Sequence, residues 1–400
     1  MGKNITSIKG ILLKILAKLY AKISVSSTSA KFIRLVVSKI TDGSFNYFKV
    51  FNPDSKQLYF YYRESPKPSF FEEGIGYLNP AIQEQFRSVN KSYTTHIGYL
   101  SEYVFVHRKP CIIEPKQGWA IDIATDQLIY PSIPYQSLIA EPYPSWIGYH
   151  FRSKKDLLID IPIISLRMMA KGWLNYWHVF GDLLGQLILL DRLGISQDIP
   201  ILIPEETYHK PFFQEMLKRS KTLSERKWIL QDRYTFVKTN EVYFVQKMPF
   251  SKEQFDGVLD YLNIPEINAD GELKLYLTRK VSRGRYLVNA LLIETIAKEY
   301  GFEIVDCDDL DFNEQISYFS KARYIVGLHG AGLTNIIFRR GGELNLLEIF
   351  PGNYAPNHYY WLSKTYAYSY DAIIGSSSID GSFEIDPVLF REKLDSFFNF

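Results

Sequence analysis

The chain has 400 residues, a length that predicts two or three domains and favours two. Hydrophobic residues make up 46% and charged residues 22%, a composition that excludes a disordered chain and is typical of a soluble globular protein. Cys111 and Cys307 are its two cysteines, which excludes a disulfide framework and a four-cysteine zinc site. The net charge of +2 conceals an asymmetry, because residues 1–41 carry eight of the 46 basic residues and no acidic one. The other 38 basic and 44 acidic residues give the body a charge of −6, which argues against nucleic acid as a partner.

The first 41 residues are predicted to form a basic amphipathic arm. Apolar residues recur there at helical spacing: Ile5, Ile8, Leu12, Ile15, Leu16, Leu19 and Ile23. Lys14, Lys18 and Lys22 share another face, so this helix fits either an anionic membrane surface or a position against the body with its lysines in solvent. The lysines interrupt any signal-peptide core, and no apolar window of about 18 residues predicts a membrane-spanning helix.

Residues 45–255 form the predicted N-terminal, acceptor-side domain. Its beginning is rich in tyrosine, phenylalanine and proline, with strand-like runs at Gln57–Tyr62 and Tyr103–His107. Later patterns predict strands at Ile161–Leu166, Ile201–Ile203, Tyr234–Lys238 and Val242–Val245, and helices at Trp173–Leu193 and Pro211–Arg219. Gly194 is expected to cap the first of these helices. The polar stretch 249–271 marks the boundary with a C-terminal domain at 265–385.

In the C-terminal domain, apolar strand-like runs alternate with amphipathic segments. The pattern predicts strands at Leu273–Leu277, Phe302–Val305, Tyr324–Leu328 and Leu344–Ile349, and helices at Tyr286–Tyr300, at Asn313–Ala322 and from Leu333–Phe338 onward. This alternation is typical of the α/β class, with a parallel sheet and right-handed crossovers. Ligands of such sheets bind beyond the carboxyl ends of the strands.

The run His329–Asn335 follows one of these strands and opens a helix. Gly330, Ala331 and Gly332 are small, so a ligand can approach the backbone closely. The start of a helix offers N–H groups without intrahelical partners and the positive end of the helix dipole, which together favour a phosphate or diphosphate. The alternative is a tight turn that needs glycine for its geometry alone.

Basic residues gather where the strand Leu273–Leu277 ends: Arg279, Lys280, Arg283 and Arg285. Guanidinium groups at this edge can hold a diphosphate through paired hydrogen bonds, and the alternative is a basic loop in solvent. Glu348 lies at the end of another predicted strand, where it is expected to accept hydrogen bonds from a ribose.

Two polar residues of the helix Trp173–Leu193 are candidates for acid–base chemistry. His178 and Asp182 are four residues apart and therefore project from one face. A carboxylate beside an imidazole is a plausible general base, and the alternative is a pair that only braces the helix. Asp182 is the preferred proton acceptor because a carboxylate stays ionised at neutral pH, whereas His178 fits the same role because imidazole titrates near that pH.

Other patterns point to different chemistry. Asp306 and Asp308 form an Asp-x-Asp pair after a strand, which fits either a divalent cation bound with a nucleotide-sugar or an acidic loop in solvent. The run Leu328–Gly332 is similar to the oxyanion loop of α/β-hydrolases, but the chain has no Gly-x-Ser-x-Gly sequence for their nucleophile. No His-Glu-x-x-His sequence or closely spaced cysteines and histidines support zinc catalysis.

Several of these stretches, in this order, resemble glycosyltransferase family 61, the capsular-polysaccharide-biosynthesis type. The most specific is Val326–Asn335 with Leu346–Pro351 after it. Asn175–Asp182 is similar to the family's Asn-Tyr-x-His-aromatic motif, and residues 277–285 are similar to its arginine-bearing strand end. The resemblance covers about residues 165–375.

This resemblance implies an inverting, metal-independent glycosyltransferase that needs no cofactor and uses a nucleoside-diphosphate sugar as donor. It also implies the GT-B architecture, in which two Rossmann-like domains face a cleft and the C-terminal one binds the donor. The expected donor-binding residues are then Arg279, Arg283, Arg285, His329, Gly330, Ala331, Gly332, Asn335 and Glu348. The base is expected from the N-terminal half, as Asp182 or His178.

The resemblance further predicts a role in the synthesis of capsule or another cell-surface polysaccharide. The acceptor is expected to be a glycan or a lipid-linked glycan, and the arm is expected to hold the enzyme on the inner face of the cytoplasmic membrane. One alternative is a catalytically silent GT-B-like protein that scaffolds a polysaccharide assembly complex. Another is a metal-dependent transferase that uses Asp306 and Asp308.

Overall fold

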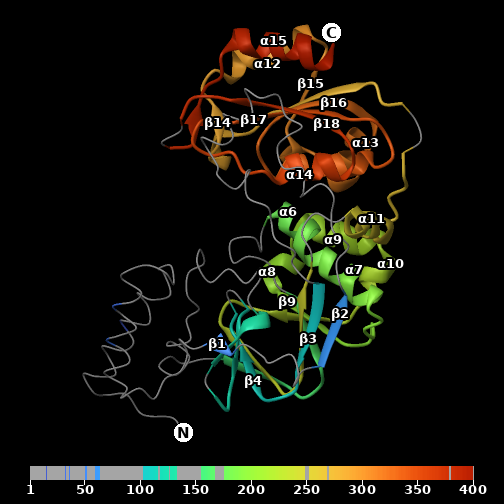
Figure 1. Cartoon of the computed structure of the whole chain (residues 1–400), viewed down its shortest axis with the longest axis vertical. Coiled ribbons are helices and arrows are strands. Elements are labelled where there is room, and N and C mark those ends of the chain that lie inside the picture. Colours follow the sequence, from blue (N-terminus) through green and yellow to red (C-terminus); the bar gives the residue numbers. More distant parts are fainter. Residues whose placement is uncertain are drawn as a thin grey trace. The chain divides into compact units, whose positions relative to one another are not determined.

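The computed structural model describes residues 50–51, 59–63, 102–115, 118–125, 127–132, 155–166, 175–247, 252–267, 270–377 and 380–399, and the single residues 15, 32 and 36. The chain divides into two compact units (Figure 1), one with the described residues up to 247 and the other with those from 252 onward. Ile15, Phe32 and Val36 are helical, and the rest of the expected arm lies outside the described residues. Across the described part of the chain, no helix combines the length and apolar character needed to cross a membrane.

The first unit contains two six-stranded mixed sheets. One has the order β1-β6-β5-β4-β11-β7, with β1 at Val50–Phe51, β6 at Gln127–Ile129, β5 at Ala120–Asp122, β4 at Cys111–Ile113, β11 at Thr235–Thr239 and β7 at Lys155–Ile159. The other has the order β10-β9-β8-β12-β3-β2, with β10 at Trp228–Gln231, β9 at Ile201–Pro204, β8 at Ile163–Ser165, β12 at Val242–Gln246, β3 at Glu102–His107 and β2 at Tyr59–Arg63. Side chains of both sheets form one buried core, which includes Ile113 and Val237 from the first sheet and Phe105 and Phe244 from the second.

The second of these sheets contains a parallel, Rossmann-like half. Its strands β8, β9, β10 and β12 run parallel to their neighbours in the order β10-β9-β8-β12. Counted along the chain this order is 3-2-1-4, so the strand order reverses between β8 and β12. Ligands of parallel sheets commonly bind where the order reverses, at the carboxyl ends of the strands.

A continuous helical segment follows β8. It consists of α6 (Tyr176–His178), the π-helical turn η4 (Val179–Leu184) and α7 (Gly185–Arg192). The carboxamide of Asn175 accepts the backbone N–H of Trp177 at 2.9 Å and caps the helix, and Gly194 ends it with φ 69°. The predicted helix is therefore confirmed over its described part. Shorter elements complete the unit: η2 (Tyr130–Ser132), α8 (Glu205–Tyr208), α9 (Pro211–Arg219) and α10 (Lys221–Ser224).

The second unit is built on a parallel five-stranded sheet with the order β15-β13-β16-β17-β18. Its strands are β13 (Leu273–Leu277), β15 (Glu303–Val305), β16 (Ala322–Leu328), β17 (Asn345–Phe350) and β18 (Ser369–Ile374). Counted along the chain this order is 2-1-3-4-5, so it reverses between β13 and β16. The four predicted strands are confirmed, and β18 adds a fifth.

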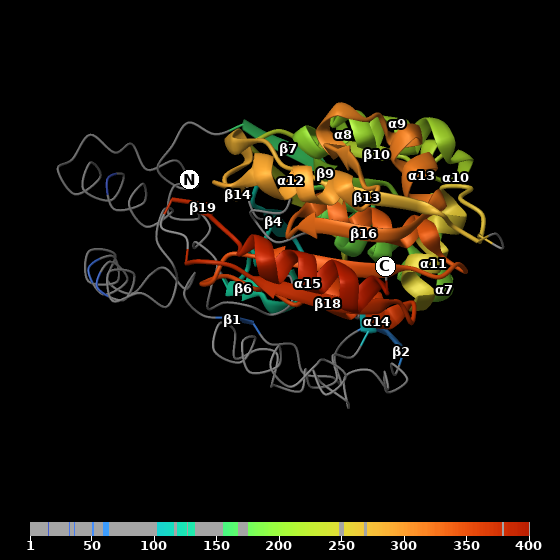
Figure 2. The same ribbon diagram turned by 90° about the horizontal axis from the view of Figure 1, so that it is seen from above.

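Helices cover both faces of this sheet (Figures 1 and 2). On one face, α12 (Ala290–Glu299) and α15 (Pro387–Phe398) pack together and contribute Ile293 and Phe390 to the core around Val326. On the other face lie α13 (Phe312–Lys321), α14 (His358–Thr365) and the 3₁₀-helix η7 (Ala331–Arg339). The short elements are η5 (Val281–Arg283), η6 (Cys307–Asp309) and the paired strands β14 (Tyr286–Leu287) and β19 (Ser382–Phe383).

One helix begins later than its pattern predicts. Tyr286 and Leu287 belong to β14 and pair with β19, so α12 begins at Ala290 rather than at Tyr286. The reason is a strand partner almost one hundred residues away in the chain, which helical periodicity does not reveal.

The helix α11 (Lys252–Tyr261) is fastened to the second unit by a buried arginine. Arg340 is 8% exposed and donates hydrogen bonds to the Asp260 carboxylate at 2.8 Å and to the backbone carbonyls of Asp256 and Ile264 at 3.1 and 2.8 Å. The hydroxyl of Tyr366 also donates to the Asp256 carboxylate at 3.0 Å. Residues 252–264 therefore pack with the second unit. Of these, residues 252–255 fall within the expected N-terminal domain, and residues 256–264 fall between the two expected domains.

Candidate active site

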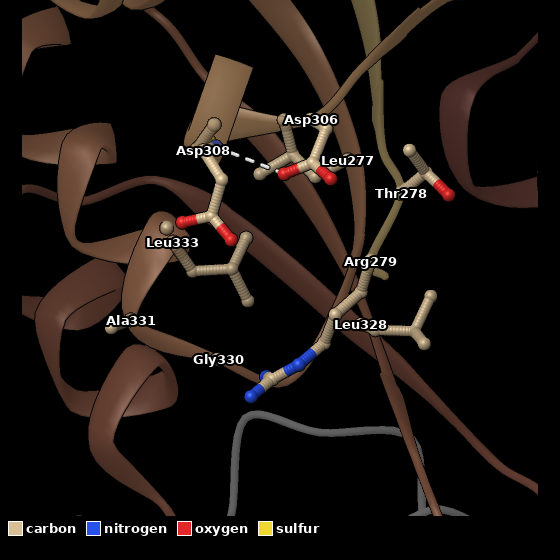
Figure 3. A pocket seen from close by; sticks show the side chains of 11 residues that line it. Leu277, Thr278, Arg279, Asp306, Asp308, Leu328, Gly330, Ala331 and Leu333 are labelled. Atoms are coloured by element: carbon tan, nitrogen blue, oxygen red, sulfur yellow. Dashed lines mark hydrogen bonds between the residues drawn. The ribbon is translucent and has the colours of Figure 1, made fainter. Parts of the chain in front are cut away.

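A pocket opens at the carboxyl edge of the parallel sheet, where the strand order reverses between β13 and β16 (Figure 3). Three segments that end or follow strands form its walls: residues 277–279, residues 306–308, and residues 328 and 330–333. His329 is not among the lining residues. The empty volume is about 560 Å³, which includes the open mouth. The loops predicted to follow β13, β15 and β16 at one edge of the sheet therefore surround a single pocket.

Arg279 lies against the loop that follows β16 (Figure 3). Its Nη1 donates a hydrogen bond of 3.0 Å to the backbone carbonyl of His329. A methyl group at Gly330 would overlap the same nitrogen, so the absence of a side chain there is what lets the guanidinium lie on the loop. An added Cβ at Gly332 would lie 3.0 Å from the Sγ of Cys307. The small residues of this loop thus allow two neighbouring segments to reach its backbone.

The helix η7 starts at Ala331, beside the Arg279 guanidinium. The N–H groups of a first helical turn lack partners within the helix, and the helix dipole places partial positive charge there. An arginine and a helix start on the same wall make this part of the pocket suitable for a phosphate or diphosphate.

His329 is held inside the second unit by a buried carboxylate. Its Nδ1 lies 2.5 Å from Oε1 of Glu348, and the other oxygen of Glu348 accepts the hydroxyl of Tyr370 at 2.7 Å. Burial raises the pKa of Glu348 well above its usual value. Burial, followed by the charge of Arg285, lowers the pKa of His329 well below its usual value. Glu348 and His329 then share one proton. Their contact fixes the position of His329, whose backbone carbonyl accepts the hydrogen bond from Arg279.

In the first unit, His178 and Asp182 are in direct contact. The Nδ1 of His178 lies 2.6 Å from Oδ2 of Asp182, so the two side chains lie on one helix face as predicted. Asp182 is 4% exposed and belongs to the π-helical turn η4. Turns of this type are rare and frequently occur at functional sites.

A buried lysine faces the same carboxylate. Lys247 directly follows β12, is 4% exposed, and has its Nζ 3.9 Å from Oδ1 of Asp182. Glu102, at the start of β3, is also buried and contacts Arg192 at 2.5 Å. Burial lowers the pKa of Lys247, while the carboxylates of Asp182 and Glu102 act in the opposite direction.

A comparison with protein families covers His178, Asp182, Lys247, Arg279 and the loop after β16. The model of the family described as Glycosyltransferase 61 matches residues 176–343, from the helix of His178 and Asp182 to the residues that follow η7. Residues 176–343 are a glycosyltransferase 61 region. The family's activity is sugar transfer, which implies a sugar donor and an acceptor as substrates. A comparison with curated proteins found no match.

The other expected donor-binding residues occupy several environments. The Arg285 guanidinium lies 5.0 Å from the ring centre of Tyr354, which in turn packs edge-on against His329. Asn335 is buried, and its side-chain amide donates to Gln315 at 2.7 Å, so it links η7 to α13. Arg283 ends η5, and its side chain lies outside the described residues.

The ribose contact predicted for Glu348 stays a prediction. Both carboxylate oxygens of Glu348 have partners within the protein, His329 and Tyr370, and the side chain is fully buried. The described contacts show that Glu348 holds His329.

Asp306 and Asp308 line the pocket, but their nearest contacts are within the loop and with a lysine. Oδ1 of Asp306 accepts the backbone N–H of Asp308 at 2.9 Å (Figure 3), and Oδ2 lies 3.7 Å from the Nζ of Lys280. Lys280 also contacts Asp309 at 2.5 Å. Among the residues that the structure describes, no three His, Cys, Asp or Glu side chains come together as a metal site.

Four residues of the two sites were not singled out by sequence reasoning. Thr278 and Cys307 line the pocket, and Lys247 and Tyr370 contact Asp182 and Glu348. Thr278 and Cys307 follow predicted strands almost directly, and that position is a usable signal. Lys247 and Tyr370 carry no such signal, because their importance depends on which strands are neighbours.

Proposed function

We propose that this chain is an inverting, metal-independent glycosyltransferase that moves a sugar from a nucleoside-diphosphate donor to a glycan hydroxyl. The observation that carries the proposal is the position of Arg279 on the Gly330 loop, where the strand order of the second unit reverses. A diphosphate bound in this pocket would meet a guanidinium and a helix start. These groups supply the positive charge that a departing diphosphate needs.

The resemblance to the family supports two finer features of the proposal. One is inversion at the anomeric carbon, and the other is a GT-B arrangement in which the two units face each other across a cleft. The donor then belongs to the second unit, with Arg279 and Arg285 near its diphosphate. The acceptor belongs to the first unit.

We assign the base to Asp182. In an inverting transfer the acceptor hydroxyl attacks the anomeric carbon from the side opposite the departing diphosphate, and a base removes its proton. Asp182 holds a carboxylate against His178 at 2.6 Å, a distance over which a proton can be shared. His178 orients this carboxylate, and it is the alternative proton acceptor.

We also propose a cellular setting. The eight basic residues and the absence of acidic residues in the first 41 positions favour attachment to an anionic membrane surface. The protein would then work peripherally on the inner face of the cytoplasmic membrane, where it would extend a lipid-linked glycan of a capsule or another surface polysaccharide.

The test is transfer or donor hydrolysis by the purified full chain. Release of nucleotide is measured with a panel of UDP-sugars and GDP-sugars, and with a CMP-sugar that carries a single phosphate, each with and without EDTA. The expected result is release from one diphosphate donor, unchanged by EDTA and abolished by Arg279→Ala. Arg233→Ala is the matched control, because Arg233 is an exposed arginine of the first unit that pairs with Glu206. Activity that EDTA abolishes would contradict metal independence, and a chain that binds nucleotide without turnover would be a scaffold.

A further inference from the structure

Reversal of strand order in the first unit brings a buried lysine to the proposed base. The helix that carries Asp182 follows β8, and Lys247 follows β12. β8 and β12 are neighbouring parallel strands, and the order of the strands reverses between them. Both side chains therefore lie at the carboxyl edge of the sheet, at the position where such sheets bind their ligands.

Among the described residues, charged groups from several elements lie near Asp182. His178 of α6 contacts Oδ2 of Asp182 at 2.6 Å, and Lys247 faces Oδ1 at 3.9 Å. Glu102 of β3 faces the same lysine and contacts Arg192 of α7 at 2.5 Å. Two carboxylates, a lysine and an arginine thus share one buried region, with the imidazole at its edge.

A carboxylate at the exposure of Asp182 has little water to stabilise its charge. Removal from water favours the protonated form of a carboxyl group, which cannot act as a base. A positive charge within about 4–6 Å opposes this effect and commonly shifts the titration of a carboxyl group by 1–3 pH units. The Nζ of Lys247 lies within that range.

We infer that Lys247 is a positioning residue whose positive charge keeps Asp182 ionised and directed at His178. This inference rests on the proposed role of Asp182 as the base. Lys247 has no contact with the acceptor in this scheme and acts through the carboxylate alone. Removal of its charge changes the pH at which the base works, which a lysine that only fills space would not do.

The first experiment needs no substrate. The ring of His178 is followed by NMR through a pH titration of the full chain, with His178→Gln to assign its signal. Lys247→Met removes a nearby positive charge, so the midpoint of the His178 titration should move to higher pH, whereas Lys247→Arg should leave it within a few tenths. An unchanged midpoint in Lys247→Met overturns the inference. If that variant does not fold, Lys247→Gln, which keeps a hydrogen-bonding group at the buried position, provides the same comparison.

The second experiment uses the diphosphate sugar that the donor panel selects. The acidic limb of the rate profile should move up by about 1–3 pH units in Lys247→Met and should return toward the original position in Lys247→Arg. Asp182→Asn separates the two proposals. If Asp182→Asn keeps its rate, the base assignment fails; if it loses its rate while Lys247→Met leaves the profile in place, only the role of Lys247 fails.

Discussion

Replacement of Gly330 by alanine tests whether the loop after β16 exists to seat Arg279. The added methyl group would overlap Nη1 of Arg279, the nitrogen that donates to the carbonyl of His329 at 3.0 Å. The overlapping atom is the end of the flexible Arg279 side chain, so the guanidinium can move away without a change in the backbone conformation. We therefore expect Gly330→Ala to fold with an unfolding midpoint close to that of the unmodified protein.

The loss in donor binding follows from the bond that the displaced guanidinium can no longer make. A hydrogen bond to a charged group contributes about 1.5–3 kcal/mol. Since about 1.4 kcal/mol corresponds to a factor of ten, Gly330→Ala should weaken binding of the donor nucleotide by roughly 10- to 150-fold. Titration calorimetry with UDP and GDP measures this change directly. Gly330→Val should block binding more completely.

A double-mutant comparison shows whether the effect passes through Arg279. If the methyl group acts by displacing the guanidinium, Gly330→Ala should have little further effect in the Arg279→Ala background. Additive losses would mean that the loop and the arginine contribute separately. Unchanged nucleotide affinity in Gly330→Ala would refute the reasoning and reduce the loop to a turn.

The remaining predictions concern other parts of the chain. Asp182→Asn should reduce the transfer rate by ~10²–10⁴-fold with donor binding intact, and a normal rate in Asp182→Asn together with lost transfer in His178→Ala would move the base to His178. Arg285→Ala should weaken donor binding several-fold, and unchanged affinity would remove Arg285 from the diphosphate site. Folding raises the pKa of Glu348 and lowers that of His329, so their effects offset each other until pH exceeds the usual value of histidine, above which the free energy of unfolding should fall. Glu348→Gln should flatten this fall in denaturant titrations, and an unaltered slope would contradict the buried-proton assignment. Deletion of residues 1–41 should release the protein from anionic vesicles in sedimentation assays, and retained binding would show that the arm is not the anchor.

The second unit was largely predictable from sequence because its strands are short apolar runs separated by amphipathic helices. Leu273–Leu277 and Asn345–Phe350 are of this kind and occur close to where the pattern places them. β18 was not predicted, since Ser369–Ile374 mixes polar and apolar residues. It forms a strand through its pairing with β17, which no local pattern specifies.

The residues of the two sites also differ in how far the sequence predicts them. Arg279 and Gly330 were predicted because each follows a strand of the same sheet, and parallel strands bring their carboxyl ends to one edge. His178 and Asp182 were predicted from their spacing within one helix. Lys247 was not predicted, since a single lysine after a strand is ordinary; its burial and its distance to Asp182 depend on the order of strands in the sheet.

The contacts of Arg340 determine where the second unit can be cut from the chain. A fragment that starts at residue 265 keeps this arginine but removes the Asp260 carboxylate and the two carbonyls that it binds. A buried charge that loses its partners costs several kcal/mol, enough to unfold many domains. A fragment that keeps these hydrogen bonds must therefore include α11, and it must include α15, whose Phe390 and Leu394 belong to the core.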